Sequence, residues 1–537
     1  MIIDAFTLVG GNPMRPVKVG IHELRAAMDR NGVDMAMTMS LRAATTDAVA
    51  GNDQILEIAR QDPRILPVCV IDPRDTMRQD RILKTGVDEG AAAFAFFRTA
   101  GLAPIPMHSI LFRRALKAAA DTGKPLVFVS RSSGEISLIA EATRDVHCEK
   151  VLLAGVSYHD LGEAMAVLEE FDHIHVETSW QLSPGCIELL ARAGGSGGSG
   201  GIERVMVGSM AALRPMRPAL NMVADADLAP ADKAKVLAGN ALRFLGRENE
   251  AAAVEKAAVA EAPLEVRGLP VEPAIDVHCH FNLGPEQPST CLGPADIQKQ
   301  LERFNIERAV VSSTAAYMDD LNAGNRETME HVERYDRLYA SPVINAHHLE
   351  DSIRWLDIAQ AHPKVGHVTL NAYTTFEPFG TPVWMRLFAE VAARGLPLFY
   401  NTRSEDHLRK PPHPAGGHLA KMRAASIEEV DMFHRINERF PQMPAIIGHG
   451  LGLEGLELVR TCPNIYLELC SSFPEQNVYR RAVDAVGADR VLFGTDLETF
   501  SPAFTLGSLW EADLDEQQQS MILRENALRI LKLNRRA

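Results

Sequence analysis

The chain contains 537 residues, 46% hydrophobic and 23% charged, a composition that excludes collagen-like, low-complexity and wholly disordered proteins. Its 55 Lys and Arg residues are outnumbered by 70 Asp and Glu residues, and the net charge of −15 speaks against a nucleic-acid partner. Half of this length is close to one α/β barrel of about 250 residues, so two barrels are an arrangement to test.

The chain begins with Met1 to Phe6 in apolar alternation, without the basic and apolar regions of a signal peptide. The seven cysteines are scattered and form no C-x-x-C pair, the pattern of a reduced, intracellular protein. No apolar run reaches 18 residues, so we expect no membrane-spanning segment. These features together predict a cytoplasmic protein with no membrane partner.

Short segments recur in the same order along the two halves. Ile3-Asp4 is matched by Ile275-Asp276, 272 residues later. Further matches pair Ala50-Gly51-Asn52 with Ala323-Gly324-Asn325, residues 204–209 with 490–495, and residues 240–243 with 526–529. Because so many matches in one order are hard to obtain by chance, we predict a tandem duplication of one domain.

Two segments have the composition of spacers. Gly194–Gly201 contains only Gly and Ser, typical of a flexible loop, either natural or engineered. Residues 247–273 are rich in Ala and Glu and then punctuated by Pro, which indicates a helical linker. We therefore predict domains at 1–246 and 274–537, joined by the 247–273 linker.

Each half alternates short β-branched runs with amphipathic helical segments. In the second half the expected strands are 274–277, 309–313, 338–345, 365–370, 396–400, 445–448, 465–468 and 490–494. Strands that alternate with helices predict a parallel sheet, and eight of them close a (β/α)₈ barrel. The predicted fold is α/β, with two tandem TIM-type (β/α)₈ barrels as an internal pseudo-dimer that is open to further self-association.

Polar side chains mark the ends of strands one, six and eight of the second half, where a barrel carries its reactive groups. His278 and His280 stand two residues apart, so both imidazoles point to one face and can share a divalent cation. His449 ends strand six and Asp496 ends strand eight. A carboxylate there completes a metal site or acts as the base for a water molecule.

This set of motifs resembles the amidohydrolase superfamily, most closely the amidohydrolase-related branch that includes aminocarboxymuconate semialdehyde decarboxylase. The resemblance covers Ile275 to Leu531 and, more faintly, the first half. It implies a barrel with one divalent metal ion, usually zinc, held by His278, His280 and Asp496. It also implies that His449 is an acid/base or a polariser of the substrate or water.

The sequence departs from the family pattern at two strand ends. Strand five ends in Asn401 where the family has a histidine, and strand four ends in Asn371 instead of a Lys-Leu-His pattern. An amide oxygen is a poor zinc ligand. Three readings follow: His449 becomes a ligand, a loop histidine substitutes, or the pocket works without metal, as in some lactonases that resemble this branch.

A 22-residue insertion relative to the first half follows strand five. Its basic residues include Arg403 and His407, and they suit an anionic substrate because Arg pairs with carboxylates in a bidentate manner. A solvated basic loop is the alternative. We predict Arg403 and His407, with Asn401 and Asn371, as substrate-binding residues for a small-molecule carboxylate.

The first half has lost these groups. The positions that match the ligands and neighbours of the second half carry Phe6, Leu8, Val129, Gly155 and Met210. None of these side chains offers a ligand for a hard or borderline cation. The first half is therefore predicted to be a degenerate barrel without metal.

The leading expectation is a metal-dependent hydrolase of a small anionic molecule. A metal-activated water in the second half would attack an amide or lactone bond, with Asp496 as base and His449 polarising the carbonyl. The alternatives are a metal-dependent non-oxidative decarboxylase and a metal-free lactonase. A non-catalytic binding protein is the third class, and the joint retention of both histidines of strand one with His449 and Asp496 speaks against it.

Overall fold

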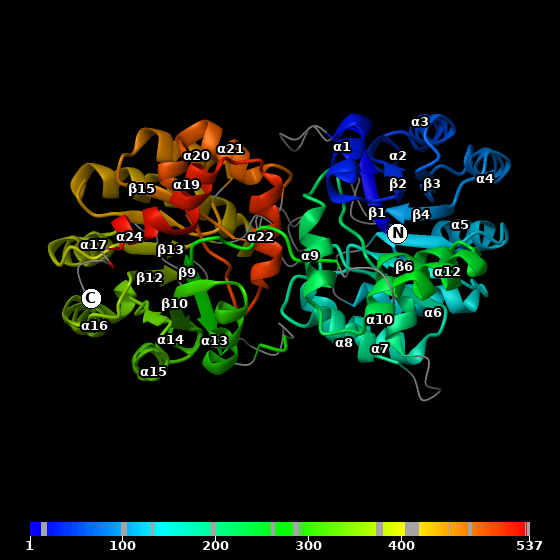
Figure 1. The fold of residues 1–537 in the computed structure, drawn as a ribbon. Helices are drawn as coiled ribbons and strands as arrows, with labels where there is room; N and C mark the ends of the chain where they lie inside the picture. Colours follow the sequence, from blue (N-terminus) through cyan, green and yellow to red (C-terminus); the bar gives the residue numbers. More distant parts are fainter. Residues whose placement is uncertain are drawn as a thin grey trace. The chain divides into compact units, whose positions relative to one another are not determined.

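The computed structural model divides into two compact units (Figure 1), and each is described by itself. The first comprises Met1–Arg267 with Pro285–Thr290, and the second comprises Gly268–Gly284 with Cys291–Ala537. The residues that the structure describes are 1–11, 19–97, 105–129, 134–194, 200–258, 264–282, 289–291, 293–371, 380–402, 418–450, 452–470, 475–531 and 533. Most of the Gly/Ser segment Gly194–Gly201 therefore lies outside them.

Eight parallel strands in sequential order form the sheet of the first unit. They are β1 (Ile3–Val9), β2 (Met35–Ser40), β3 (Ile65–Val70), β4 (Ala93–Phe97), β5 (Leu126–Val129), β6 (Val151–Ala154), β7 (Ile174–Glu177) and β8 (Val205–Met206). All seven residues of β1 are buried, as expected for a parallel strand covered on both faces. Ala5 N donates to Val207 O at 2.8 Å, so β1 meets the end of β8 and the sheet nearly closes, consistent with the predicted TIM-type barrel.

Helices follow the strands of the first unit, and the last of them come after β8. They are α1 (Ile21–Asn31), α2 (Leu41–Thr45), α3 (Ala48–Gln61), α4 (Gln79–Asp88), α5 (Ile110–Ala120), α6 (Glu135–Asp145), η1 (Tyr158–Asp160), α7 (Leu161–Glu170), α8 (Cys186–Arg192), η2 (Gly201–Arg204), α9 (Arg217–Asp225), α10 (Pro230–Ala234), η3 (Lys235–Gly239), α11 (Asn240–Phe244) and α12 (Glu248–Ala258). Local sequence explains several boundaries: the Asp47 side chain accepts the first amides of α3, and Gly32, in the left-handed region at φ 67°, ends α1.

The second unit also has eight strands, divided between two parallel sheets. The first sheet contains β9 (Ala274–Phe281), β10 (Ile306–Ser313) and β11 (Leu338–Ala340), and the second contains β12 (Val368–Asn371), β13 (Leu398–Asn401), β14 (Ala445–Ile447), β15 (Ile465–Leu469) and β16 (Val491–Phe493). Single bridges, Ala340 with Val365 and Cys279 with Leu497, link the two sheets on either side. The predicted α/β class and strand order are met, although the second set of strands is not one continuous sheet.

The helices of the second unit again follow the strands. They are α13 (Pro294–Arg303), α14 (Ala315–Met318), α15 (Leu321–Arg334), η4 (Ala346–His348), α16 (Leu349–Ala361), α17 (Pro382–Ala393), α19 (His418–Arg439), α20 (Gly452–Thr461), α21 (Val478–Val486), η6 (Ala488–Arg490), α22 (Pro502–Glu511), α23 (Glu516–Ser520), η7 (Met521–Glu525) and α24 (Asn526–Ile530). None of the helices within the described residues is both long and apolar enough to cross a membrane.

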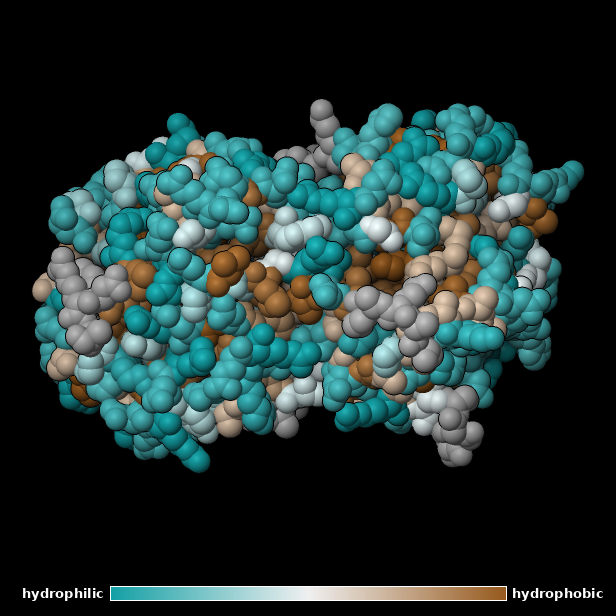
Figure 2. Space-filling model, in the orientation of Figure 1, coloured by the Kyte–Doolittle hydropathy of each residue, from teal (hydrophilic) through white to brown (hydrophobic). Residues whose placement is uncertain are grey.

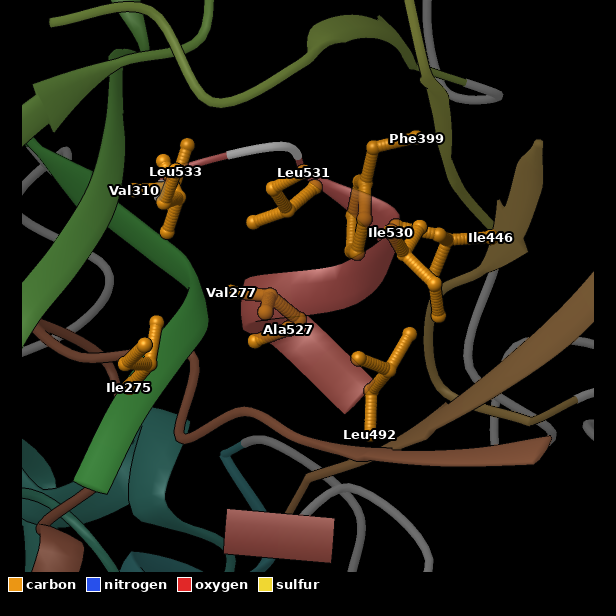
Figure 3. Packing of buried hydrophobic residues seen from close by; sticks show 10 residues of the cluster. All are labelled: Ile275, Val277, Val310, Phe399, Ile446, Leu492, Ala527, Ile530, Leu531 and Leu533. Atoms are coloured by element: carbon orange, nitrogen blue, oxygen red, sulfur yellow. The ribbon is translucent and has the colours of Figure 1, made fainter. Parts of the chain in front are cut away.

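An apolar core lies beneath the strand ends of the second unit. Figure 3 shows side chains from five strands meeting those of α24 and the residues after it: Ile275, Val277, Val310, Phe399, Ile446, Leu492, Ala527, Ile530, Leu531 and Leu533. The visible surface is mostly hydrophilic, with apolar residues in patches (Figure 2), as expected when apolar side chains are concentrated inside. This packing fixes the strands whose polar ends are described next.

Candidate active site

The backbone at the end of β16 places Asp496 against β9. Asp496 N donates to His278 O at 2.8 Å, and His280 N donates to Leu497 O at 2.6 Å. Asp496 itself has a φ of 57°, in the left-handed region that few residues other than Gly, Asn and Asp adopt. The turn therefore directs a carboxylate at the two histidines of strand one.

The carboxylate of Asp276 links the same two segments by hydrogen bonds. Its carboxylate accepts hydrogen bonds from His278 N at 3.0 Å, Thr495 N at 3.1 Å and Thr495 Oγ1 at 2.5 Å. Burial raises the pKa of Asp276 to about 7, although these hydrogen bonds oppose the rise. Asp276 is thus a positioning residue that holds β9 and the β16 turn in register.

The two imidazoles and the carboxylate form a compact cluster. His278 Nε2 lies 3.0 Å from His280 Nε2, and each of these nitrogens lies 3.6 Å from Asp496 Oδ1. Ligand atoms about 2.0–2.1 Å from a tetrahedral ion would stand about 3.3 Å apart, so the three atoms are spaced as a metal site requires. The structure thus brings together the three residues predicted as metal ligands.

The outer nitrogens of both imidazoles have partners of their own. His278 Nδ1 lies 3.1 Å from Glu468 Oε2, and His280 Nδ1 lies 2.8 Å from Ser312 Oγ. When the Nδ1 protons face these oxygens, both Nε2 lone pairs converge on one point near Asp496. Facing lone pairs are favourable only with a cation or a proton between them, so the donor set fits a divalent cation.

Burial without cationic side chains dominates the electrostatics of the cluster. It lowers the pKa of His278 to about 3 and that of His280 well below its usual range. It raises the pKa of Asp496 well above its usual range, with the charges of Glu468 and Asp276 adding to the effect. Among the described residues the carboxyl groups of Glu468 and Asp496 lie within 3.6 Å of histidine nitrogens and pair with no Lys or Arg side chain.

His449 joins the cluster through Asn401. His449 Nε2 lies 2.8 Å from Asn401 Oδ1, and Asn401 Nδ2 lies 3.0 Å from His280 Nε2. The backbone of His449, at φ 60°, directs its N–H to Glu468 Oε2 at 3.0 Å. Both predicted residues therefore reach the site, with Asn401 between the two imidazoles.

Sequence reasoning missed Glu468, Cys470 and Ser312. Glu468 is completely buried, and burial raises its pKa to about 7. Cys470 Sγ lies 3.0 Å from His449 Nδ1, and Cys470 forms a second candidate ligand group with His278 and His449. A signal for Glu468 was present, because a charged residue ends the same apolar strand in both halves, as Glu177 and Glu468.

The predicted substrate-binding residues divide into two groups. Asn371 is buried and pairs in register with Asn401 across β12 and β13, so both asparagines stand at the same strand ends. Arg403 and His407 lie outside the described residues, as does most of the insertion that carries them.

The matching positions of the first unit are apolar. Phe6 and Leu8 are completely buried, Val129 and Met210 are nearly so, and position 155 is Gly. Met210 N donates to Phe6 O at 2.7 Å and has a φ of 63°, so the backbone follows the path that it takes at Asp496.

Comparisons with known proteins complete this picture. Residues 275–533 match a family model described as amidohydrolase. Similar solved structures include the 5-carboxyvanillate decarboxylase of Sphingomonas paucimobilis, at 14% identity and a TM-score of 0.40, covering 48% of this chain and 99% of that one. A dihydroxybenzoic acid decarboxylase from Polaromonas sp. JS666, with bound manganese and 2-nitroresorcinol, is 18% identical, with a TM-score of 0.41 and coverage of 49% and 98%.

The 2,6-dihydroxybenzoate decarboxylase from Rhizobium is 16% identical, with a TM-score of 0.40, and the match covers 49% of this chain and 100% of that one. Each of these three structures thus corresponds in length to about half of this chain. No curated protein sequence matches the chain.

Proposed function

We propose that the second unit is a metal-dependent enzyme that acts on a small carboxylate and releases carbon dioxide, since residues 275–533 match the amidohydrolase family model. The observation that carries this proposal is the His278–His280–Asp496 cluster. Two imidazoles and one carboxylate suit a divalent first-row transition ion, with zinc and manganese as the leading identities.

The acidic groups around the cluster make the binding of a carboxylate substrate depend on the proposed cation. Asp276, Glu468 and Asp496 are buried together, and no Lys or Arg side chain among the described residues pairs with them. A substrate carboxylate that enters this site needs a positive charge, which a cation held by the cluster supplies. When bound, that cation would anchor the carboxylate and stabilise negative charge that develops during the reaction.

The same groups favour decarboxylation as the reaction. The carbon that loses carbon dioxide must take up a proton, and the carboxyl groups of Asp496 and Glu468 lie at the cluster, beside His278. Asp496 is the more exposed of the two carboxyl groups, at 7% against none for Glu468, so it is the one that can face a substrate. Glu468 instead positions the His278 ring.

Hydrolysis of an amide or lactone bond is the second candidate. It is favoured by His449, whose ring lies with its centroid 4.9 Å from that of His278 and at an interplanar angle of 79°. A carbonyl bound near His278 would therefore have an imidazole beside it as acid or base. Under this alternative Asp496 accepts a proton from water instead of donating one to carbon.

A second part of the proposal concerns the common origin of the two units. We infer that both descend from one duplicated domain and that the first has no metal chemistry. In support, Asn52 Nδ2 donates to Val70 O at 2.8 Å and Asn325 Nδ2 donates to Val343 O at 2.9 Å, at corresponding places in the two units. The arrangement of the units as an internal pseudo-dimer stays a prediction.

Metal content of the purified full-length chain tests the metal site. We expect about one divalent ion per chain, lost in His278→Ala and in Asp496→Ala, with catalytic rate reduced by roughly 1,000-fold. His362→Ala is the matched control, because His362 pairs with Glu333 on the helical side of the unit. A wild-type chain without stoichiometric metal would refute the proposal and leave a metal-free lactonase.

The reaction is identified with a panel of small aromatic and unsaturated acids beside lactones and amides. Carbon dioxide released from an acid, and lost in Asp496→Ala, supports decarboxylation. Acid produced from a lactone or an amide, without carbon dioxide from any member of the panel, would decide for hydrolysis.

A further inference from the structure

An unbroken chain of hydrogen-bonding groups runs from Cys470 to Ser312 across the site. Cys470 Sγ lies 3.0 Å from His449 Nδ1, and His449 Nε2 lies 2.8 Å from Asn401 Oδ1. Asn401 Nδ2 then lies 3.0 Å from His280 Nε2, and His280 Nδ1 lies 2.8 Å from Ser312 Oγ. The metal-dependent function proposed above makes no use of the thiol at its beginning.

The proton positions along this chain follow from its chemistry. Without a cation in the cluster, the Asn401 amide nitrogen donates to His280 Nε2, and the amide oxygen faces His449. That oxygen can only accept, so His449 Nε2 carries the proton of the neutral ring. His449 Nδ1 therefore presents a lone pair to Cys470 Sγ, the arrangement in which an imidazole removes a proton from a thiol.

We propose that Cys470 is a nucleophile toward small activated acyl compounds, namely esters and lactones, with His449 as its base and Asn401 as the group that orients the imidazole. A thiol, an imidazole and an amide oxygen in this order make up the catalytic arrangement of cysteine hydrolases on unrelated folds. The activity goes beyond the proposed decarboxylation, since acyl transfer by Cys470, His449 and Asn401 needs no cation.

The three groups stand together at the ends of neighbouring strands. Cys470 follows β15, His449 follows β14 and Asn401 ends β13, so all three stand at the strand ends where a parallel barrel binds its substrates. Cys470 and His449 are each 6% exposed, close to the value for Asp496, whereas Glu468 behind them is completely buried.

The reaction has two balanced steps. In the first, the thiol proton moves to His449 Nδ1, Sγ bonds to the acyl carbon, and the bond from that carbon to the leaving oxygen breaks as the oxygen takes the proton from His449. In the second, water gives a proton to His449 and adds to the acyl carbon. The Sγ–carbon bond breaks, the thiol recovers its proton, and a carboxylic acid is released.

Other thiols of the second unit provide the comparison. Cys462 Sγ lies 3.6 Å from His434 Nδ1, a similar thiol and imidazole pair on the helical side. Among the described residues no amide oxygen accepts from His434. Cys279 is buried with its Sγ 3.9 Å from Thr495 Oγ1, and burial raises the pKa of this thiol well above its usual range. Only Cys470 combines a base, an orienting amide and a strand-end position within this described set.

The test exposes the full-length protein, as purified and after chelator treatment, to p-nitrophenyl acetate. Intact mass and peptide mapping after an acid quench then locate the acetyl group. We expect acetylation of Cys470 about 100-fold faster than of Cys462, in both preparations. Cys470→Ala should abolish the fast release of p-nitrophenol, Cys470→Ser should reduce it about as strongly, and Cys462→Ala should leave it unchanged.

Two results would overturn the proposal: acetyl transfer to Cys470 no faster than to Cys462, or fast release that survives in a folded Cys470→Ser variant. Circular dichroism checks that each variant is folded. Metal content and carbon dioxide release are read separately on the same preparations. Failure of the thiol chemistry and failure of the metal-dependent function therefore give different results.

Discussion

The strand ends of the two units have the same backbone hydrogen bonds and differ in their side chains. In the first unit Met210 N donates to Phe6 O at 2.7 Å, and in the second Asp496 N donates to His278 O at 2.8 Å. Both donors have a left-handed backbone, with φ of 63° and 57°. A left-handed position, which strains a residue with a side chain, is thus present in both units whether it carries Met or Asp, so the turn serves the fold as well as the candidate site.

Two buried carboxyl groups are also common to both units. Asp4 accepts from Phe6 N and Ser209 N at 3.1 Å each, as Asp276 accepts from the amides of His278 and Thr495. Glu177 accepts from Gly155 N as Glu468 accepts from His449 N. Both units therefore share the backbone turn and the two buried carboxyl groups. At the matching positions, only the second unit has the imidazoles of His278 and His280 and the carboxylate of Asp496.

The largest effect is expected when the proposed ligand side chains of the second unit are introduced at the matching positions of the first unit. The triple variant Phe6→His, Leu8→His, Met210→Asp should bind one additional divalent ion, because the backbone frame and Glu177 are already in place. We expect its affinity to be about 10–100-fold below that of the second unit, since the strand neighbour of Leu8 is Met39, where His280 has the hydroxyl of Ser312.

This graft is measured by calorimetric metal titration in a background that carries His278→Ala, so that only the first unit can respond. The single variants Phe6→His and Met210→Asp serve as controls and should bind no ion. If the triple variant is folded and takes up no metal, the shared frame is insufficient to build the site.

A smaller effect on metal binding is expected to distinguish the two buried glutamates, Glu468 and Glu177. Glu468→Gln should weaken metal binding by about 10–100-fold, because an amide no longer stabilises the His278 tautomer that leaves Nε2 free to bind. Glu177→Gln, the matched change in the first unit, should leave metal binding unchanged. Equal losses in both variants would show that this position acts only through the fold.

Much of this organisation could be predicted from local patterns. The spacing of His278 and His280 on one strand predicts two imidazoles on one face, and parallel strands bring Asp496 to the same end. The alternation of apolar runs with helices likewise predicts the eight-stranded sheet of the first unit, which is confirmed in its class and strand order.

The remaining features depend on contacts between distant strands. Ser312 contacts His280, 32 residues away in the sequence, and Cys470 contacts His449, 21 residues away. No local sequence pattern indicates either contact. The division of the second set of strands into two sheets depends on pairing at β11 and β12, which strand propensity does not specify. The predicted roles of Arg403 and His407 lie outside the described residues and stay predictions.

The smallest expected effect is a pH dependence of the stability of the first unit. Burial raises the pKa of Glu177 from 4.5 to about 7, and burial likewise raises that of Asp4 to about 6. The folded unit therefore binds these protons more tightly than the unfolded chain does. The stability contribution of Glu177 is full below about pH 4.5 and is lost as the pH rises through about 7.

Glu177→Gln removes this dependence, so wild type should lose more stability than the variant between about pH 5 and pH 8, by up to about 1.4 kcal/mol per unit of pKa difference. Urea titrations at the two pH values measure this stability. Pulsed hydrogen exchange at a common labelling pH then reports the unfolding of the first unit, because peptides of β6 and β7 belong to that unit.

The control is Glu169→Gln, an exposed change on α7, which should behave as wild type. A wild-type unit that gains stability relative to Glu177→Gln over this range would contradict the assignment. A loss as predicted would mean that the first unit retains a protonated carboxyl group at the position where, in the second unit, Glu468 faces the imidazole of a proposed metal ligand.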